Sequence, residues 1–182
     1  QVLGDHVAQK GSLVAPERLR FDFSHTKPIS DDDLARIEDL ANHVVLQNEP
    51  VVTRLMGVEE AIESGARALF GEKYGDEVRM LKMGDFSTEL CGGTHVARPG
   101  QLGVIKLISE SSIGAGVRRV EALVGADAYR FLAREHILVN QLTDLIKGAK
   151  SEELPERILE LITKLKTKHR SIDRTRSGTG VN

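Results

Sequence analysis

The change of hydrophobic period near Gly125 constrains the fold more than any other feature of the sequence. Before it, short runs such as Leu19–Phe23 alternate apolar and charged residues. After it, apolar residues recur three, four or seven positions apart. A period of two is typical of half-buried strands, whereas spacings of three and four are typical of helices. We therefore predict an α+β fold for residues 1–125, with an antiparallel sheet and packed helices, and a helical extension for residues 126–182.

Capping and turn residues divide the first part into elements. Ser30 is the predicted N-cap of a helix that ends at Asn48-Glu49-Pro50. The acidic triplet Asp31–Asp33 suits the positive end of that helix, and the alternative is a metal site. The other predicted elements are strands at Val7–Val14, Leu19–Phe23, Val51–Met56, Val78–Met83, Leu102–Glu110 and Val117–Val124, a helix at Val58–Ala68, and a long hairpin turn at Ser111–Gly116.

The second part is predicted to contain two helices interrupted by Gly148 and Pro155. Their apolar stripes consist of Phe131, Leu138, Leu142 and Leu145, and of Leu154, Ile158, Leu161 and Leu165. The stripes predict a helical hairpin or contact with a neighbouring domain or subunit; the alternative is a helix packed on its own domain. The basic stretch Lys164–Arg176 is predicted to be a tail, either solvated or touching phosphates. Ser177–Gly180 is predicted to be disordered.

Composition narrows the class of protein. The 182 residues suffice for a buried core, which must be mainly aliphatic because only 4% are aromatic and tryptophan is absent. The net charge of −2 gives no global signature of nucleic-acid binding. A single cysteine excludes an internal disulfide and fits a reducing cytosol. Because no apolar run or leader signal is visible, we expect a cytoplasmic protein that does not enter a membrane.

Cys91 and His95 form the candidate metal site. Thiolate sulfur and imidazole nitrogen are ligands that Zn²⁺ prefers, and Gly92-Gly93 between them permits a tight turn. Structural zinc takes four protein ligands and catalytic zinc about three, so this pair alone is a weak signal. The alternative is an inert cysteine beside an unrelated histidine.

The sequence around this pair resembles the editing domain of alanyl-tRNA synthetases. The similar motifs, in the same order, are Gln9-Lys10-Gly11-Ser12, Leu19-Arg20-Phe21-Asp22-Phe23-Ser24-His25, Ser87–His95 and Gly114-Ala115-Gly116-Val117-Arg118-Arg119-Val120-Glu121-Ala122. The resemblance covers roughly residues 1 to 165. Free-standing Ala-tRNA deacylases and the threonyl-tRNA synthetase editing domain share the Cys-x₃-His pair, but the helical extension is more similar to the full synthetase.

This resemblance implies a zinc-dependent hydrolase of mischarged tRNA. Its expected substrates are Ser-tRNA(Ala) and Gly-tRNA(Ala), and its expected partners are the tRNA(Ala) acceptor end, other synthetase domains and a second copy bound through the extension. The family's zinc site includes a His-x₃-His helix, and Gln1–Gly4 is similar to the end of that helix. The chain is therefore expected to carry two of four zinc ligands and to be inactive alone. ATP would bind only to a separate aminoacylation domain.

The resemblance also suggests roles for individual residues. Gln9 matches a glutamine of the editing pocket, and the alternative is a surface residue at a strand edge. Thr94 is a candidate to place a hydroxyl near the substrate or to serve the turn. Arg118 and Arg119 lie beside a glycine-rich turn where phosphate contact is easy, but one is expected to face a carboxylate such as Glu121 or Asp85. His25 is either near the site or structural.

Two other functions compete with the editing hydrolase. One is a non-catalytic module for tRNA binding and oligomerisation within the same protein, which would lack the His-x₃-His helix. The other is a small zinc-stabilised structural domain unrelated to tRNA. That domain would unfold when a chelator removes zinc, and it would not affect charged tRNA. A free-standing relative of the Ala-tRNA deacylases is a further alternative.

Overall fold

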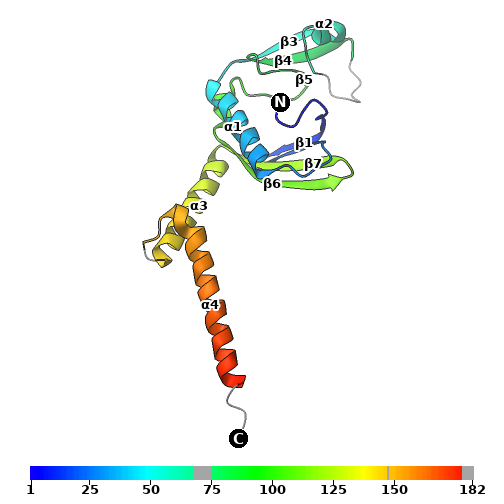
Figure 1. Cartoon of the computed structure of the whole chain (residues 1–182). Helices are drawn as coiled ribbons and strands as arrows, with labels where there is room; N and C mark the ends of the chain where they lie inside the picture. The colour runs from blue at the N-terminus through cyan, green and yellow to red at the C-terminus, as the bar shows by residue number, and fades with distance from the viewer. Residues whose placement is uncertain (68–74, 147, 178–182) are drawn as a thin grey trace. The chain divides into compact units, whose positions relative to one another are not determined.

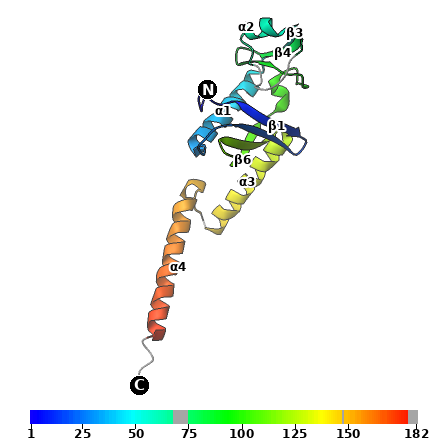
Figure 2. The same cartoon turned by 90° about the vertical axis from the view of Figure 1, so that its right-hand side faces the viewer.

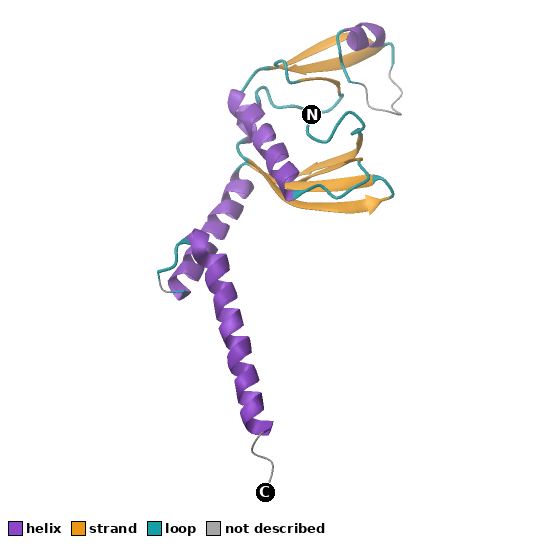
Figure 3. Ribbon diagram, in the orientation of Figure 1, coloured by secondary structure: helices purple, strands orange, loops and turns teal. Residues whose placement is uncertain are grey.

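A computed structural model describes residues 1–67, 75–146 and 148–177 (Figure 1). The chain divides into two compact units, Gln1–Arg130 and Phe131–Asn182, each of which is described by itself. The first contains two antiparallel sheets with helices, and the second is helical (Figure 3). The predicted α+β class with a helical extension is thus confirmed. The division of the chain falls inside the helix that follows Gly125 rather than at Gly125 itself.

The larger sheet has the strand order β1-β2-β7-β6 and is antiparallel throughout. Its strands are β1 (Gln9–Ala15), β2 (Arg18–Ser24), β6 (Ile105–Gly114) and β7 (Val117–Val124). Phe21 of β2 lies opposite Ser12 on one side and Val120 on the other. The sheet therefore joins the first 24 residues of the chain to a hairpin about a hundred residues later.

Alternation in β2 places the aromatic side chains on one face, as predicted. Phe23 is 4% exposed and its ring centroid lies 6.1 Å from that of Phe21. The opposite face is not fully wet, because Asp22 is only 7% exposed. The Asp22 carboxylate accepts two hydrogen bonds from Arg119, at 2.7 and 2.9 Å, and this pairing compensates for the loss of water.

The hairpin between β6 and β7 is tighter than predicted. Ladder pairing continues to Gly114 opposite Val117, so only Ala115 and Gly116 form the turn. Gly116 has a φ of 70°, a conformation that glycine adopts without a steric cost. The serine-rich segment predicted as a long turn is therefore mostly strand, because its backbone pairs with β7.

Helix α1 (Asp31–Gln47) begins and ends where the sequence predicted. The Ser30 hydroxyl accepts a hydrogen bond from the Asp33 backbone N–H at 3.1 Å, so the acidic triplet belongs to a helix start. The helix packs against β6 through polar contacts. Asn42 Nδ2 donates to the Ile105 carbonyl and the Ile105 N–H donates to Asn42 Oδ1, both at 2.8 Å. This side chain thus satisfies the backbone of an edge strand.

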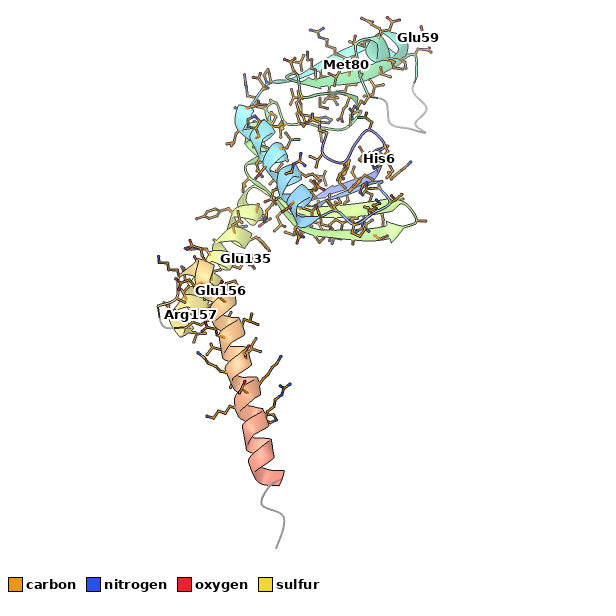
Figure 4. All side chains as sticks on the ribbon, viewed as in Figure 1. His6, Glu59, Met80, Glu135, Glu156 and Arg157 are labelled. Carbon is orange, nitrogen blue, oxygen red and sulfur yellow. The ribbon has the colours of Figure 1, made fainter. Side chains whose placement is uncertain are left out.

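The smaller sheet has the order β3-β4-β5, with β3 (Val51–Gly57), β4 (Glu77–Met83) and β5 (Ser87–Leu90). Helix α2 (Val58–Glu63) is shorter than predicted, and the predicted end at Ala68 lies outside the described residues. The buried core of this sheet consists of Ala61, Ala66, Val78, Met80 and Leu90, with Met80 labelled in Figure 4. Sequence patterning missed β5 because four residues are too few to show a period.

Residues 48–51 and 97–102 connect the smaller sheet to the rest of the unit. Asn48 adopts a left-handed conformation at the end of α1, and its side chain accepts from the Gly100 N–H at 2.9 Å. Arg98 donates to the Asn48 carbonyl at 2.7 Å just before the 3₁₀ helix η1 (Pro99–Leu102). The Val51 N–H donates to the Ala97 carbonyl at 2.9 Å. The two connections therefore meet at one place.

The extension consists of α3 (Ala126–Leu145), a 3₁₀ turn η2 (Ser151–Glu153) and α4 (Leu154–Ser177), whose residues Glu156 and Arg157 are labelled in Figure 4. As predicted, the first helix ends before Gly148 and a second helix contains Leu154. Pro155 is the second residue of α4, where a missing N–H is tolerated. The basic stretch Lys164–Arg176 is helical and not a tail. Of the predicted disordered end, Gly178–Gly180 lies outside the described residues.

The apolar stripes of α3 and α4 are exposed in part: Leu154 is buried and Phe131 and Leu142 are half-buried, whereas the other members are exposed. Leu138, Leu145 and Leu165 are 50%, 76% and 67% exposed, and Leu161 is 49% exposed. The predicted stripes are therefore present but do not bury each other as a close-packed hairpin would. Figure 2 shows both helices from a second direction.

The segment before β1 contains no helix, so Gln1–Gly4 does not continue a helix as predicted. A fragment of one turn cannot satisfy its own backbone groups, which makes an isolated helix end unfavourable. His6, labelled in Figure 4, instead contacts His25: their ring nitrogens are 2.8 Å apart and their ring centroids 5.1 Å apart. His25 thus belongs to a structural pair.

Candidate functional site

The predicted zinc ligands lie in the loop that follows β5. The Cys91 N–H donates to the Arg79 carbonyl of β4 at 3.1 Å, which extends the pairing of β4 and β5 by one residue. After Cys91 the backbone leaves the sheet, and Gly92 and Gly93 lead to Thr94 and His95. Cys91 is half-buried and His95 is exposed, so one ligand is fixed by the sheet and the other faces solvent.

Cys91 and His95 both lie close to the position that a Gly93 side chain would occupy. A Cβ atom built on Gly93 would lie 3.5 Å from Cys91 Sγ and 3.8 Å from His95 Cε1. Sulfur and imidazole therefore flank a common space that the absent side chain leaves open. By contrast, beyond its chain neighbours no heavy atom lies within 4 Å of a Cβ built on Gly92. The prediction that this loop brings Cys91 and His95 together is consistent with this geometry.

The Gly93 carbonyl is the centre of the loop's hydrogen bonding. It accepts from Arg79 Nη1 at 2.5 Å, and it lies 3.1 Å from His95 Nδ1. A carbonyl oxygen cannot donate, so Nδ1 must carry the proton in this contact. In a neutral imidazole, Nε2 is then left with a free lone pair, which is the form that binds a metal.

The donor set fits half of a zinc shell. One thiol and one imidazole flank a shared space, and both are ligands that zinc accepts. Within residues 1–67, 75–146 and 148–177, no group of three or more His, Cys, Asp or Glu side chains is placed to hold a metal. Further ligands would be needed to complete a tetrahedral site.

The other two predicted site residues do not join this pair directly. Gln9 begins β1 in the larger sheet, is half-buried, and donates from Nε2 to Ser12 Oγ at 3.3 Å. Thr94 is exposed in the loop itself. Among the described contacts, neither residue bonds to Cys91 or His95. Their roles toward a substrate therefore stay predictions.

Arg118 and Arg119 are both ion-paired, with carboxylates other than those predicted. Arg118 donates from Nε and Nη2 to Glu110, the second contact being 2.6 Å. Arg119 binds Asp22 as described above, not Glu121 or Asp85. These hydrogen bonds raise the pKa of each guanidinium, and the bond from Arg119 lowers the pKa of Asp22. Both arginines stabilise the sheet and are not free for phosphate.

A separate groove of about 630 Å³ runs between the second half of α1 and the turn from β4 to β5. Leu40, Val44, Pro50 and Phe86 supply apolar walls, and His43 and Lys82 supply polar atoms. None of the four predicted site residues lines it. Sequence reasoning could not have found this groove, because it joins segments that are far apart in the chain.

In the described part of the chain, no helix combines the length and the apolar character needed to cross a bilayer.

Comparison with known proteins shows that the chain is similar to parts of aminoacyl-tRNA synthetases. Residues 78–121 match the family model described as the threonyl and alanyl tRNA synthetase second additional domain. The chain is 52% identical over 178 residues to an alanine–tRNA ligase of a Nocardioides species, which covers 98% of this chain and 20% of the relative. It is 56% identical to alanine–tRNA ligases of a Chelativorans species and of Rhizobium johnstonii, which cover 85% of this chain and 19% of each relative.

These matches confirm the predicted relationship to alanyl-tRNA synthetase. The chain spans about a fifth of the length of these relatives. The matched region, residues 78–121, includes β4, β5, the Cys91–His95 loop and most of the β6–β7 hairpin.

Proposed function

We propose that this chain, which is related to alanine–tRNA ligases over nearly its whole length, carries the editing site of an alanyl-tRNA synthetase. Its reaction is hydrolysis of the ester that joins serine or glycine to tRNA(Ala). The observation that carries the proposal is the convergence of Cys91 Sγ and His95 on the space beside Gly93, inside a matched synthetase domain.

The chemistry of the substrates explains why such a site is useful. A pocket for the methyl group of alanine cannot exclude the smaller glycine. It also rejects serine poorly, since added hydroxyl groups are discriminated by only about 10²-fold in an apolar pocket. A second pocket that hydrogen-bonds the serine hydroxyl can discriminate by about 10⁴-fold or more. Hydrolysis in that second pocket removes the error and spares Ala-tRNA(Ala).

Each candidate residue has a defined role in this proposal. Cys91 and His95 would hold zinc together with a His-x₃-His helix of the longer protein. When bound, zinc would polarise the ester carbonyl, activate water or anchor the substrate. Gln9 would position the substrate, because an amide can donate and accept hydrogen bonds at once. Thr94 would offer a hydroxyl to the aminoacyl group.

The test uses the chain extended by the upstream His-x₃-His helix. We expect this protein to hydrolyse Ser-tRNA(Ala) much faster than Ala-tRNA(Ala). Cys91→Ala should lose zinc and lower the deacylation rate, whereas Gln9→Ala should lower the rate with zinc retained. His43→Ala is the matched control, because His43 is exposed and lines the separate groove. A Cys91→Ala variant that loses zinc but keeps the parent rate would exclude a role for the metal.

The proposal also makes an expectation for the 182-residue chain by itself. Two donors satisfy half of a tetrahedral shell, so the purified chain should hold far less than one zinc per molecule. Atomic absorption after dialysis measures this content. A value near one tightly held zinc per chain would mean that other donors complete the site.

A second function, self-association through the extension, is supported by the exposed stripes of α3 and α4. Water-exposed leucine and isoleucine side chains at helical spacing favour burial against another helix. Sedimentation equilibrium should show concentration-dependent dimers in the parent chain. Replacing Leu161 and Leu165 by glutamate should give monomers, and a parent chain that is monomeric at high concentration would exclude this function.

A further inference from the structure

A hydrogen-bond chain connects β4 to the imidazole of His95. Arg79 lies in the middle of β4, and its carbonyl already accepts from the Cys91 N–H. Its guanidinium reaches forward to the Gly93 carbonyl at 2.5 Å. The same carbonyl accepts from His95 Nδ1 at 3.1 Å. One arginine thus contacts the loop at two points, one before and one after the glycine pair.

The glycine pair explains why such a contact is needed. Gly92 and Gly93 have no side chains to pack, and a peptide between or after two glycines has wide conformational freedom. Nothing but backbone neighbours surrounds the Cβ position of Gly92 within 4 Å. Without a donor on its oxygen, the Gly93 carbonyl would rotate among several directions. A planar, charged guanidinium favours one direction of that carbonyl.

The direction of the Gly93 carbonyl decides which nitrogen of His95 carries the proton. With the carbonyl in place, Nδ1–H has an acceptor and Nε2 keeps its lone pair. In metal sites, the partner of the second ring nitrogen commonly fixes the tautomer and the ring orientation of a histidine ligand. Arg79 acts one step further out, because it holds the carbonyl that holds the imidazole.

We propose that Arg79 is a positioning residue of the editing site: by fixing the Gly93 carbonyl it keeps His95 in the Nδ1–H form, with Nε2 free to bind a metal. The role of Arg79 in editing rests on the proposed function, but its effect on the His95 tautomer concerns only this chain. Arg79 touches neither a substrate nor the metal. Its side chain also leaves the shared space beside Gly93 open, since no Arg79 atom lies within 4 Å of a Cβ built on Gly93.

The test reads the tautomer directly, in the 182-residue chain without metal. Long-range ¹H–¹⁵N correlation spectra at pH 8 distinguish the two neutral tautomers of each histidine, and a His95→Gln variant assigns the signals of His95. We expect the Nδ1–H form to dominate in the parent. Arg79→Met, which keeps the aliphatic chain and removes every donor, should shift His95 toward the Nε2–H form. Arg79→Lys, which restores a cationic donor, should recover at least part of the parent signal.

The matched control is Arg54→Met. Arg54 lies on the neighbouring strand opposite Met80, on the other face of the same sheet from Arg79. The Arg54→Met substitution removes the same charge as Arg79→Met, and it should leave the His95 tautomer unchanged. Backbone amide shifts of the larger sheet report whether each variant is folded, and Arg79→Leu, which also lacks any donor, provides a second variant should Arg79→Met unfold. An unchanged His95 tautomer in folded Arg79→Met or Arg79→Leu would overturn the proposal.

A cobalt titration separates this inference from the proposed function. Co²⁺ bound to a cysteine thiolate absorbs in the near ultraviolet, so the single cysteine reports on this site alone. We expect the Co²⁺ affinity of Arg79→Met to fall about 10-fold or more, in the range seen when outer-shell partners are removed. The titration uses the protein extended by the His-x₃-His helix. If that protein gives no thiolate band, the proposed metal site is wrong, and the tautomer result still decides the role of Arg79.

Discussion

Replacing Gly93 by alanine tests the space between the two proposed metal donors, Cys91 and His95, without disturbing the fold. The added methyl would lie 3.5 Å from Cys91 Sγ and 3.8 Å from His95 Cε1, which are ordinary van der Waals distances. Gly93 is not among the described glycines with positive φ, so alanine fits its backbone. Gly92→Ala is the matched control, since its methyl would point into open space.

The two variants should have the same stability but different metal affinities. Gly→Ala at a compatible position restricts the unfolded chain and stabilises by about 0.4–1 kcal/mol in each case. Zinc needs to approach sulfur to about 2.3 Å and nitrogen to about 2.0 Å. A methyl in contact with both donors hinders that approach. We expect the zinc affinity of Gly93→Ala to fall by about 10- to 100-fold, equivalent to about 1.4–2.8 kcal/mol.

The single cysteine makes the measurement specific. Iodoacetamide alkylates Cys91 only, and bound zinc slows this reaction, so the protection constant reports metal affinity at this loop. Urea unfolding followed by circular dichroism measures the free energy of unfolding of the same samples. Equal protection constants for Gly92→Ala and Gly93→Ala would refute the idea that zinc occupies the space beside Gly93.

Three further predictions concern the fold that carries the site. Asn42→Ala should lower the free energy of unfolding by about 2 kcal/mol, because two backbone groups of an edge strand lose their partner while helix propensity improves by about 0.6 kcal/mol. Amide hydrogen exchange of β6 measures this loss, and Gln47→Ala serves as a control that should leave the exchange of β6 unaffected. Gly100→Ala should destabilise as well, since its Cβ would lie 2.5 Å from Asn48 Oδ1, and an unchanged urea midpoint would contradict this. The lowered pKa of Asp22 means that its ion pair stabilises the fold above the pKa of the unfolded carboxyl and that this stability is lost as pH falls through the folded value. In Asp22→Asn, the free energy of unfolding should therefore fall less steeply as the pH is lowered than it does in the parent chain. The same dependence on acid pH in both proteins would contradict a stabilising role of this ion pair.

Local signals predicted the parts of the fold that local physics determines. The alternation in Leu19–Phe23 predicted β2, and the serine followed by three aspartates predicted the start of α1, because both depend on residues close in sequence. The Cys-x₃-His spacing with two glycines likewise predicted a loop that carries Cys91 and His95, and their role as metal ligands stays a prediction. These predictions needed no knowledge of distant segments.

Long-range pairing limited what could be predicted. The carboxylate beside Arg119 could not be predicted, because Asp22 is ninety-seven positions from Arg119 and only the strand order brings them together. Glu110 is only eight positions from Arg118, and the register of the β6–β7 hairpin brings these two side chains together. The hydrogen bond from Arg79 to the site loop was missed for the same reason: β4 and β5 pair across a turn that no period reveals. The basic end of α4 was misread because charge was weighed above helix propensity, although lysine and arginine are good helix formers.

The two chain segments that connect the smaller sheet to the rest of the unit meet near Asn48 and Ala97, so the smaller sheet is structurally a separate module. Residues 51–97, which contain the smaller sheet and the Cys91–His95 loop, begin and end at one backbone hydrogen bond between Val51 and Ala97. A segment whose ends touch closes its own loop, so its removal or exchange costs the host little chain entropy. The larger sheet pairs only strands outside this segment. The segment that carries the Cys91–His95 loop is thus a unit that a host sheet could gain, lose or exchange without altering its own strand order.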